Sequence, residues 1–298
     1  MSQRITCPTR LIWDARCLLG EGPVWCDKES SLYFVDIKGK HLLRWHAGQV
    51  GKCFPLKRET GAVVPCANGG LLAAQTGGFG FIELDPWRET SIGPPVDESS
   101  RNRFNDGKCD AAGRFWVASM DDACRQATGV VWCLSPDGTV RRHVDGFVVG
   151  NGFGWSRDGR TMYFTDSENR RILAYPFDMK TGTLGTSRCF ASIDPYDGYP
   201  DGLTVDDDDH VWSAHWDGGC VTRYRPDGSV ERVIALPVPR PTSLAFGGSE
   251  RRTLFVTSAR IGLGRAELEA APLSGALFAL DTGFSGPLPE MFGGIRYQ

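Results

Sequence analysis

Short stretches of alternating apolar and polar residues recur along the chain, and each one ends at a polar turn. The alternation has a period of two, as at Leu32 and Phe34 or at Met162 and Phe164, and this period is typical of β-strands. Turn pairs such as Asp-Gly and Asn-Gly lie between the strands. Since no segment shows a sustained apolar stripe at helical spacing, the pattern predicts an all-β protein.

The predicted strands are grouped in repeats that share one order: a turn-rich start, a short strand rich in aromatic and β-branched residues, a second strand and a polar turn. Four clear copies and two weaker ones cover residues 22–46, 62–86, 105–140, 151–178, 201–230 and 242–281. A spacing of about 40 to 50 residues is expected when each repeat forms one four-stranded blade of a propeller. No linker or change of composition marks a second domain. We therefore predict a single six-bladed β-propeller of four-stranded antiparallel blades over residues 1–298.

The composition bears on partners and location. The chain has 298 residues, of which 41% are hydrophobic and 23% charged, with a formal net charge of -3. Lys and Arg are scattered singly or in pairs, so no basic run could neutralise a nucleic-acid backbone. Charges at Arg4, Arg10 and Asp14 interrupt any signal-peptide core, and no apolar stretch is long enough to span a bilayer. Because a closed propeller also pairs its own strand edges, we expect a cytoplasmic monomer that binds neither nucleic acid nor membranes.

The ten cysteines test the expected location. They occupy scattered positions, with no C-x-x-C pair and no Cys/His spacing that resembles a zinc site. In a chain of this length without a secretion signal, buried reduced thiols fit better than disulfides or thiol catalysis. The cysteines therefore predict no chemistry of their own.

Polar residues stand beside glycines at the start of four repeats. The starts read LGEGPVW, RFNDGKCD, GNGFGW and YPDGLTV, and they carry Glu21, Asn105 with Asp106, Asn151 and Asp201. In a propeller the innermost strand of every blade lines a central channel, so equivalent starts of different repeats converge in space. Taken singly, each residue could be a turn residue that satisfies local backbone groups. Several equivalent starts that each offer an oxygen ligand indicate a functional cluster at the mouth of the channel.

These four motifs resemble those of the gluconolactonase family, also called the senescence marker protein or regucalcin family, and the resemblance extends to TSLAFGG and LFVTSARIG near the C-terminus. It implies a six-bladed propeller with one divalent cation at the channel mouth. At the matching positions, it implies that Glu21, Asn151 and Asp201 hold this cation. Such hard ligands suit calcium, magnesium or manganese, and similar sites take zinc or ferrous iron. Three protein ligands leave positions open for water and substrate, as in a catalytic site.

The motif RFNDGK supplies the candidate substrate contacts. The resemblance implies that Arg103 and Asn105 bind the hydroxyls of a sugar, for which a guanidinium fork and an amide are suitable; a surface salt bridge and a turn cap are the alternatives. Some relatives have a Glu after the next strand, where this chain reads ASMDDACRQATG. Asp121 is our candidate there, with Asp122 as the alternative. Asp106 is expected to close the turn, because its side chain should point away from that of Asn105.

The activity implied by the resemblance is the metal-dependent hydrolysis of a sugar lactone to an aldonic acid, in pentose or hexose catabolism. In this hypothesis the cation stabilises the negative charge that builds on the carbonyl oxygen, and Asp201 takes a proton from the attacking water. Two alternatives stay open: a paraoxonase-like esterase or phosphotriesterase, and a non-catalytic calcium-binding regulatory propeller. A serine hydrolase is excluded, because TGFSGP around Ser285 lacks the closing glycine of that motif.

Two further features lie near Asp201. The acidic run at 206–209 falls in the turn between two strands of a blade, where four carboxylates are expected to form a solvated hairpin tip. An EF-hand calcium loop would need spaced ligands, a central Gly and a closing Glu, which this run lacks. His215 and Trp216 on the next strand are candidates for the channel wall, although a packed, hydrogen-bonded histidine is the alternative for His215.

Overall fold

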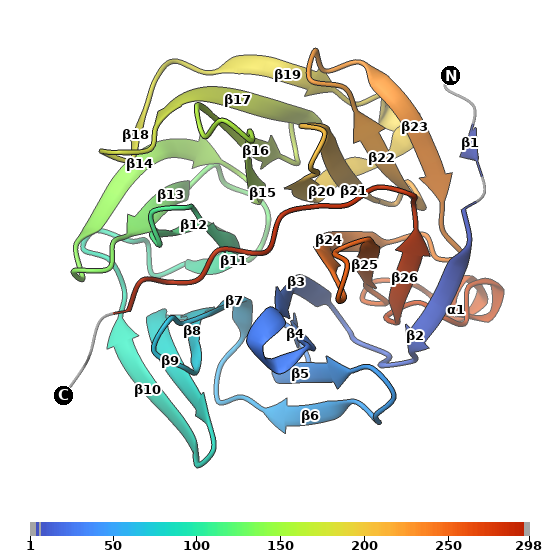
Figure 1. The fold of residues 1–298 in the computed structure, drawn as a ribbon, viewed down its shortest axis with the longest axis horizontal. Helices are drawn as coiled ribbons and strands as arrows, with labels where there is room; N and C mark the ends of the chain where they lie inside the picture. The colour runs from blue at the N-terminus through green and yellow to red at the C-terminus, as the bar shows by residue number, and fades with distance from the viewer. Residues whose placement is uncertain (1–3, 6, 295–298) are drawn as a thin grey trace.

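The computed structural model describes residues 4–5 and 7–294, and in this part of the chain six sheets surround a central channel (Figure 1). From the channel outward, the first sheet contains β3 (Gly20–Cys26), β4 (Ser31–Asp36), β5 (His41–His46) and β6 (Lys52–Pro55). The second contains β7 (Thr60–Pro65), β8 (Leu71–Gln75), β9 (Gly78–Leu84) and β10 (Trp87–Gly93). The third contains β11 (Asn102–Cys109), β12 (Phe115–Asp121), β13 (Gly129–Leu134) and β14 (Val140–Phe147). The fourth sheet contains β15 (Gly150–Trp155), β16 (Thr161–Asp166), β17 (Arg171–Asp178) and β19 (Arg188–Ser192), and the short β18 (Thr183–Leu184) also pairs with β17. The fifth contains β20 (Tyr199–Val205), β21 (Val211–Trp216), β22 (Cys220–Tyr224) and β23 (Val230–Ala235). The predicted six-bladed β-propeller is confirmed.

The last blade is completed by a strand from the other end of the chain. It contains β24 (Pro241–Gly247), β25 (Thr253–Ser258) and β26 (Leu277–Asp281), and its outermost strand is β2 (Thr9–Trp13), with Thr9 paired to Leu280. A short β1 (Arg4–Ile5) pairs in parallel with β23. The repeat pattern did not predict this closure, which joins the two ends of the ring and pairs an otherwise open edge.

Apolar side chains fill the contacts between blades. Six buried clusters occur among the described residues, one for each pair of neighbouring blades. Successive residues of one strand belong to different clusters: Trp116 packs toward one neighbouring blade and Val117 toward the other. Because strand side chains alternate between faces, inner strands are buried on both sides, and all six residues of β4 are buried.

Each innermost strand has a register irregularity near its start. In β3 it falls between Glu21 and Val24, and in β15 between Asn151 and Phe153. Within the second of these, Gly152 has a φ of +43°, a conformation that favours glycine. A β-bulge bends its strand and re-aims the neighbouring side chains. The motif glycines therefore permit the local geometry at the positions of the polar candidates.

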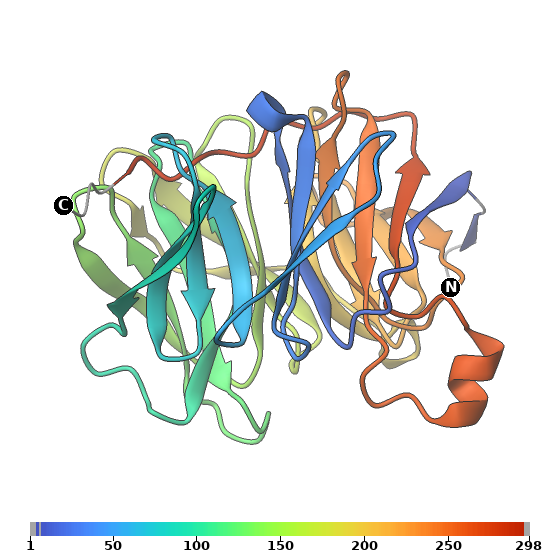
Figure 2. The same cartoon turned by 90° about the horizontal axis from the view of Figure 1, so that it is seen from below.

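The chain after β26 crosses one face of the propeller, over the channel (Figures 1 and 2). Ser285 Oγ donates to Asp207 Oδ2 at 2.7 Å, and the backbone N–H of Phe292 donates to the carbonyl of Pro65 at 2.9 Å. Phe292 is fully buried between two blades. The single α-helix in the described part of the chain, α1 (Arg265–Ala270), lies at the opposite face (Figure 2). The C-terminal segment therefore covers one end of the channel.

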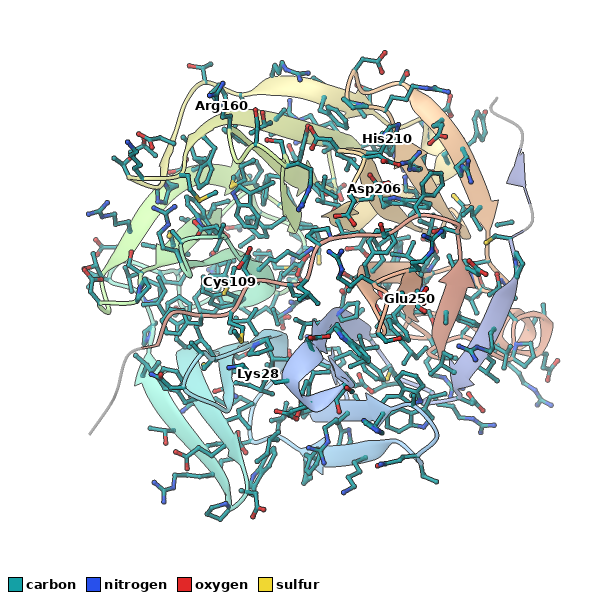
Figure 3. The ribbon with its side chains drawn as sticks, in the orientation of Figure 1. Lys28, Cys109, Arg160, Asp206, His210 and Glu250 are labelled. Atoms are coloured by element: carbon teal, nitrogen blue, oxygen red, sulfur yellow. The ribbon has the colours of Figure 1, made fainter. Side chains whose placement is uncertain are left out.

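The acidic run at 206–209 differs from its prediction at one residue. The run does lie between β20 and β21, and Asp208 is exposed. Asp206, which is labelled in Figure 3, is however fully buried. Its carboxylate accepts hydrogen bonds from Trp212 Nε1 and Arg223 Nε, both at 2.8 Å. The prediction of a solvated turn is therefore wrong for Asp206, which forms an ion pair in the core.

The same arrangement occurs in a turn of a second blade. Asp110 follows β11 as Asp206 follows β20, and it is also fully buried. Its carboxylate accepts hydrogen bonds from Arg114 Nε at 2.7 Å and Trp116 Nε1 at 2.8 Å. In both blades a Trp stands six residues after the Asp, and this spacing is the sequence signal that identifies the buried carboxylate.

Two other expectations concern cysteines and membranes. All ten cysteines are free thiols, as expected, and six of them are buried. Cys53, Cys124 and Cys189 are exposed, so the prediction of buried thiols is wrong for these three.

Within the described residues, no helix has the length and apolar character needed to cross a membrane.

Candidate active site

The candidate residues meet in a cavity of about 380 Å³ at the end of the channel where the innermost strands begin. Five of its lining residues are candidates from the sequence: Glu21, Arg103, Asn105, Asn151 and Asp201. They come from β3, β11, β15 and β20, which are the first strands of four different blades. The fold therefore brings together residues that are up to 180 positions apart in the chain.

Glu21 and Asp201 are the two buried acids of this cavity. They are 6% and 5% exposed, and Asp201 Oδ1 has no hydrogen-bond partner among the described residues. Burial raises the pKa of both carboxyl groups well above the usual range, and the nearby negative charge of Asp106 raises both further. Repulsion from Asp201 also raises the pKa of Glu21. An oxygen without a partner and two crowded carboxylates are a favourable setting for a cation.

A chain of hydrogen bonds orients the amides beside these acids. Arg103 Nη1 donates to Asn105 Oδ1 at 2.7 Å, and Asn105 Nδ2 donates to Asn151 Oδ1 at 2.8 Å. Asn151 Nδ2 in turn donates to Ser167 Oγ at 3.0 Å. Because a carbonyl oxygen has two lone pairs, Asn151 Oδ1 keeps the capacity for one more partner. These hydrogen bonds therefore fix the orientation of the Asn151 amide, with Oδ1 toward Asn105 and Nδ2 toward Ser167.

Asp106 has a larger role than the predicted turn closure. Its Oδ1 does accept a local hydrogen bond from the Gly107 N–H at 2.7 Å, but its Oδ2 accepts one from the Gly152 N–H in the next blade at 3.0 Å. Asp106 is 6% exposed, and burial raises its pKa. This carboxylate therefore ties β11 to the bulge that carries Asn151.

Lys108 is a charged residue of the channel, next to Asp106, that the sequence analysis did not single out. It follows Asp106 by two residues on β11, so both side chains are on one face of the strand. Its Nζ donates to the carbonyl oxygen of Leu203 at 2.8 Å. Burial lowers the pKa of Lys108 to about 8, and the charge of Asp106 opposes this effect. The spacing Asp-x-Lys within RFNDGK was the signal for this pair.

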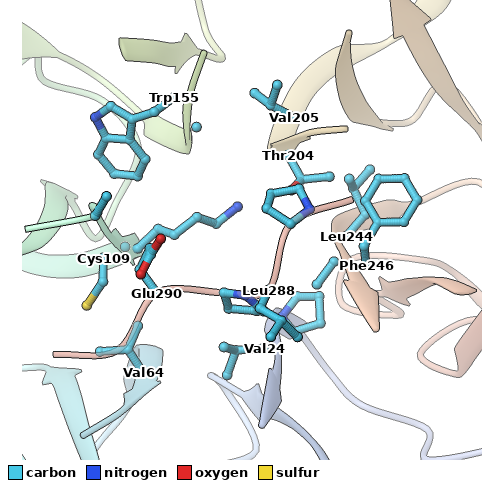
Figure 4. Close-up of a pocket in the computed structure, with 18 of the residues that line it drawn as sticks. Val24, Val64, Cys109, Trp155, Thr204, Val205, Leu244, Phe246, Leu288 and Glu290 are labelled. Atoms are coloured by element: carbon cyan, nitrogen blue, oxygen red, sulfur yellow. The ribbon is translucent and has the colours of Figure 1, made fainter. Parts of the chain in front are cut away.

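A separate cavity of about 300 Å³ lies farther along the channel, beneath the C-terminal segment (Figure 4). Leu288 and Glu290 of that segment line it, together with Asp106 and Lys108 and apolar residues such as Phe246. The predicted cation ligands Glu21, Asn151 and Asp201 line the other cavity. The candidate chemistry therefore belongs to the end of the channel that the C-terminal segment leaves uncovered.

The structure separates the two acids considered for substrate contact. The Asp121 carboxylate accepts hydrogen bonds from the backbone N–H groups of Arg125 and Gln126, at 3.0 and 3.2 Å, and it does not line the cavity. Asp122 does line it. Asp122 Oδ1 accepts from Arg103 Nε at 2.9 Å and from Lys38 Nζ at 2.8 Å. Of the two acids, Asp122 therefore lies in the cavity and Asp121 lies outside it.

The two wall candidates on β21 also have different environments. His215 is 1% exposed and does not line the cavity. Its Nδ1 lies 2.9 Å from the Asp197 carbonyl oxygen, and its Nε2 lies 3.2 Å from the Tyr224 hydroxyl. It is thus a packed, hydrogen-bonded histidine, whereas Trp216 does line the cavity.

The donor atoms decide whether the site suits a metal. No group of three His, Cys, Asp or Glu side chains arranged to hold a metal is found in the part of the chain that the structure describes. The candidate set is of another kind, since it consists of the carboxylates of Glu21 and Asp201 and the amide oxygen of Asn151. Oxygen donors of this type fit a hard divalent cation.

We expect the metal-free protein to lose stability as the pH rises. The pKa values of Glu21 and Asp201 are raised in the folded state, so above about pH 4 the folded chain holds protons that the unfolded chain has released. The free energy of unfolding therefore falls from about pH 4 up to the folded pKa values. Urea unfolding of metal-stripped protein across this range measures the slope. Asp201→Asn lacks one of the two carboxyl groups, so its free energy of unfolding should fall less steeply with pH. Equal slopes for the two proteins would contradict a raised pKa of Asp201 in the folded state.

Fold and site together define a class: six-bladed propellers with a cluster of carboxylates and amides at one mouth of the channel. The SMP-30/Gluconolactonase/LRE-like region matches residues 19–260, and the chain belongs to this family. It is 36% identical over 294 residues to the pentonolactonase XacC of Haloferax volcanii, covering 97% of this chain and 98% of the relative. It is 35% identical over 291 residues to regucalcin of Gallus gallus, covering 94% and 96%. A solved structure of the calcium-binding protein regucalcin from Agrobacterium tumefaciens superposes with a TM-score of 0.94 at 26% identity, covering 98% of this chain and 99% of that chain.

Proposed function

We propose that this protein hydrolyses a sugar lactone to the aldonic acid with the help of one divalent cation. The observation that carries the proposal is the buried set of Glu21, Asn151 and Asp201 in a cavity whose volume suits a small molecule. The similarity to a pentonolactonase over nearly the whole chain supports this substrate class. We also propose that the lactone belongs to pentose or hexose catabolism and that the protein acts in the cytoplasm as a monomer.

Each residue of the cavity has a role in the proposed reaction. Glu21, Asn151 and Asp201 would hold the cation, which when bound supplies a Lewis acid that polarises the lactone carbonyl. Asp201 takes a proton from the attacking water and later returns it to the ring oxygen. Arg103 and Asn105 bind and orient the sugar hydroxyls. This sequence of events requires no covalent bond between protein and substrate.

A calcium-binding protein without catalytic activity is the second candidate function. It is favoured by the similarity to the structure described as a calcium-binding protein, and the same oxygen atoms could bind calcium without hydrolysing anything. The two candidates differ in whether a lactone is opened, so an assay of turnover separates them.

The first test is proton release from a panel of sugar lactones, including arabinono-, xylono-, galactono- and gluconolactone. The protein is stripped of metal and resupplied with one ion at a time: calcium, zinc, manganese, magnesium or ferrous iron. We expect hydrolysis above the spontaneous rate only with a divalent ion, with clear differences between sugars. If ions bind but no lactone is opened, the lactonase proposal is wrong and the calcium-binding function takes its place.

A further inference from the structure

Two aromatic side chains form part of the wall of the site cavity. Tyr199 on β20 and Trp216 on β21 lie directly opposite each other in the strand register, and both line the cavity. Both side chains are partly exposed. Tyr199 precedes Asp201 by two residues on the same strand. This aromatic wall, as we call Tyr199 and Trp216, therefore lies beside the proposed catalytic carboxylate.

An arginine covers each ring of the aromatic wall. The guanidinium carbon of Arg170 lies 3.6 Å from the centre of the Tyr199 ring, and that of Arg240 lies 4.7 Å from the Trp216 ring. Each guanidinium also donates a hydrogen bond to a backbone carbonyl oxygen, which holds it in place. Both rings line the cavity, whereas neither arginine does. Two cation–π contacts thus hold the rings in fixed positions.

Polar side chains share the cavity with these rings and with apolar residues such as Met120 and Ile261. Arg103, Asn105 and Asp201 line the same space and offer both hydrogen-bond donors and acceptors. A ligand that satisfies both parts needs hydroxyls along its edge and a flat C–H face for an aromatic surface. A closed sugar ring has both features, whereas an open-chain sugar acid has the hydroxyls but no fixed face.

We propose that the aromatic wall recognises the closed ring of the substrate and so distinguishes the lactone from the open-chain acid formed by its hydrolysis. This inference rests on the proposed lactonase function. When the ring opens, the stacking contact is lost while the hydroxyl contacts remain available. The product therefore binds more weakly than the substrate and leaves the site. Tyr199 and Trp216 act as specificity residues that bind ground state and transition state alike, so their loss should affect KM more than kcat.

Calorimetric binding of 1,5-anhydroglucitol and glucitol tests this proposal, because the two polyols differ in ring closure. We expect the metal-loaded protein to bind the cyclic polyol about tenfold more tightly. Tyr199→Leu and Trp216→Leu should each lose most of this preference and raise KM for the lactone about tenfold, with kcat changed less than about threefold. Tyr199→Phe keeps the ring and should keep the preference. Tyr196→Leu, at an 84% exposed aromatic outside the cavity, is the matched control.

Several outcomes would overturn the proposal. Equal affinity of the unaltered protein for the two polyols is one, and a loss of both affinities to the same extent in the leucine variants is another, since it indicates a structural role. Titration with manganese shows whether each variant keeps its cation site, and either leucine variant can stand for the other if one fails to fold. If the protein opens no lactone but still prefers the cyclic polyol through these rings, the proposed function falls and the recognition of closed rings stands.

Discussion

Replacing Asp201 with asparagine is expected to lower kcat for the lactone by about a thousandfold, the usual scale of a lost general base. The substitution keeps the size of the side chain and one oxygen, but it removes the group that accepts the proton from water. Asp201 is 5% exposed and its Oδ1 has no hydrogen-bond partner among the described residues. No hydrogen bond within the described residues therefore competes with water or a cation for that atom.

The same variant should fold at least as well as the unaltered protein in the absence of metal. Burial and the charge of Asp106 disfavour the ionised form of Asp201, so a neutral amide removes an unfavourable buried charge. Proton release at saturating metal measures the activity, and thermal unfolding measures the stability. Asp227→Asn, in an exposed turn of the same blade, is the control and should keep full activity. Activity above about a tenth of normal in Asp201→Asn would contradict the assignment.

Replacing Asp206 with alanine is expected to lower the free energy of unfolding by about 3 to 5 kcal/mol, as when one partner of a buried ion pair is removed. Arg223 is 2% exposed and would stay in the core without this charge, although Glu231 and the exposed Asp208 remain as partners. The indole N–H of Trp212, a residue that is also fully buried, would lose its acceptor. Both losses leave polar groups unsatisfied inside a blade.

Asp208 provides the matched control for this prediction. It lies in the same acidic run, and its side chain is 65% exposed and contacts Arg223 at 3.3 Å. Asp208→Ala should cost less than about 1 kcal/mol, because exposed ion pairs contribute little. Equilibrium unfolding in urea compares the two variants. Similar losses at both positions would show that Asp206 behaves as a surface residue, as its sequence context alone suggested.

The fold and the position of the site could be predicted from the sequence because their signals are local. A period of two identifies strands through the alternation of side chains, and the recurrence of Gly-flanked polar motifs marks the strand that begins each blade. In a propeller these strands share one channel, so Glu21, Asn151 and Asp201 could be assigned to one site without any knowledge of distances.

Contacts between different blades could not be predicted from these local signals. The pairing of β2 with β26 joins residues about 270 positions apart, and the hydrogen bond from Gly152 to Asp106 crosses between blades. Which of Asp121 and Asp122 lines the cavity depended on how the next turn folds, since the backbone of that turn binds Asp121. Each outcome depends on which groups become neighbours in space.

The sequence by itself thus determined the strand pattern, the number of blades and the convergence of Glu21, Asn151 and Asp201 on one end of the channel. Only the tertiary structure decided that Asp206 is buried, that Asp106 and Lys108 add charges inside the channel, and that Arg170 and Arg240 support the aromatic wall. The physical reason is that periodicity and turn chemistry act over a few residues. Burial and electrostatic interactions depend on every group within several ångströms, whatever its position in the chain.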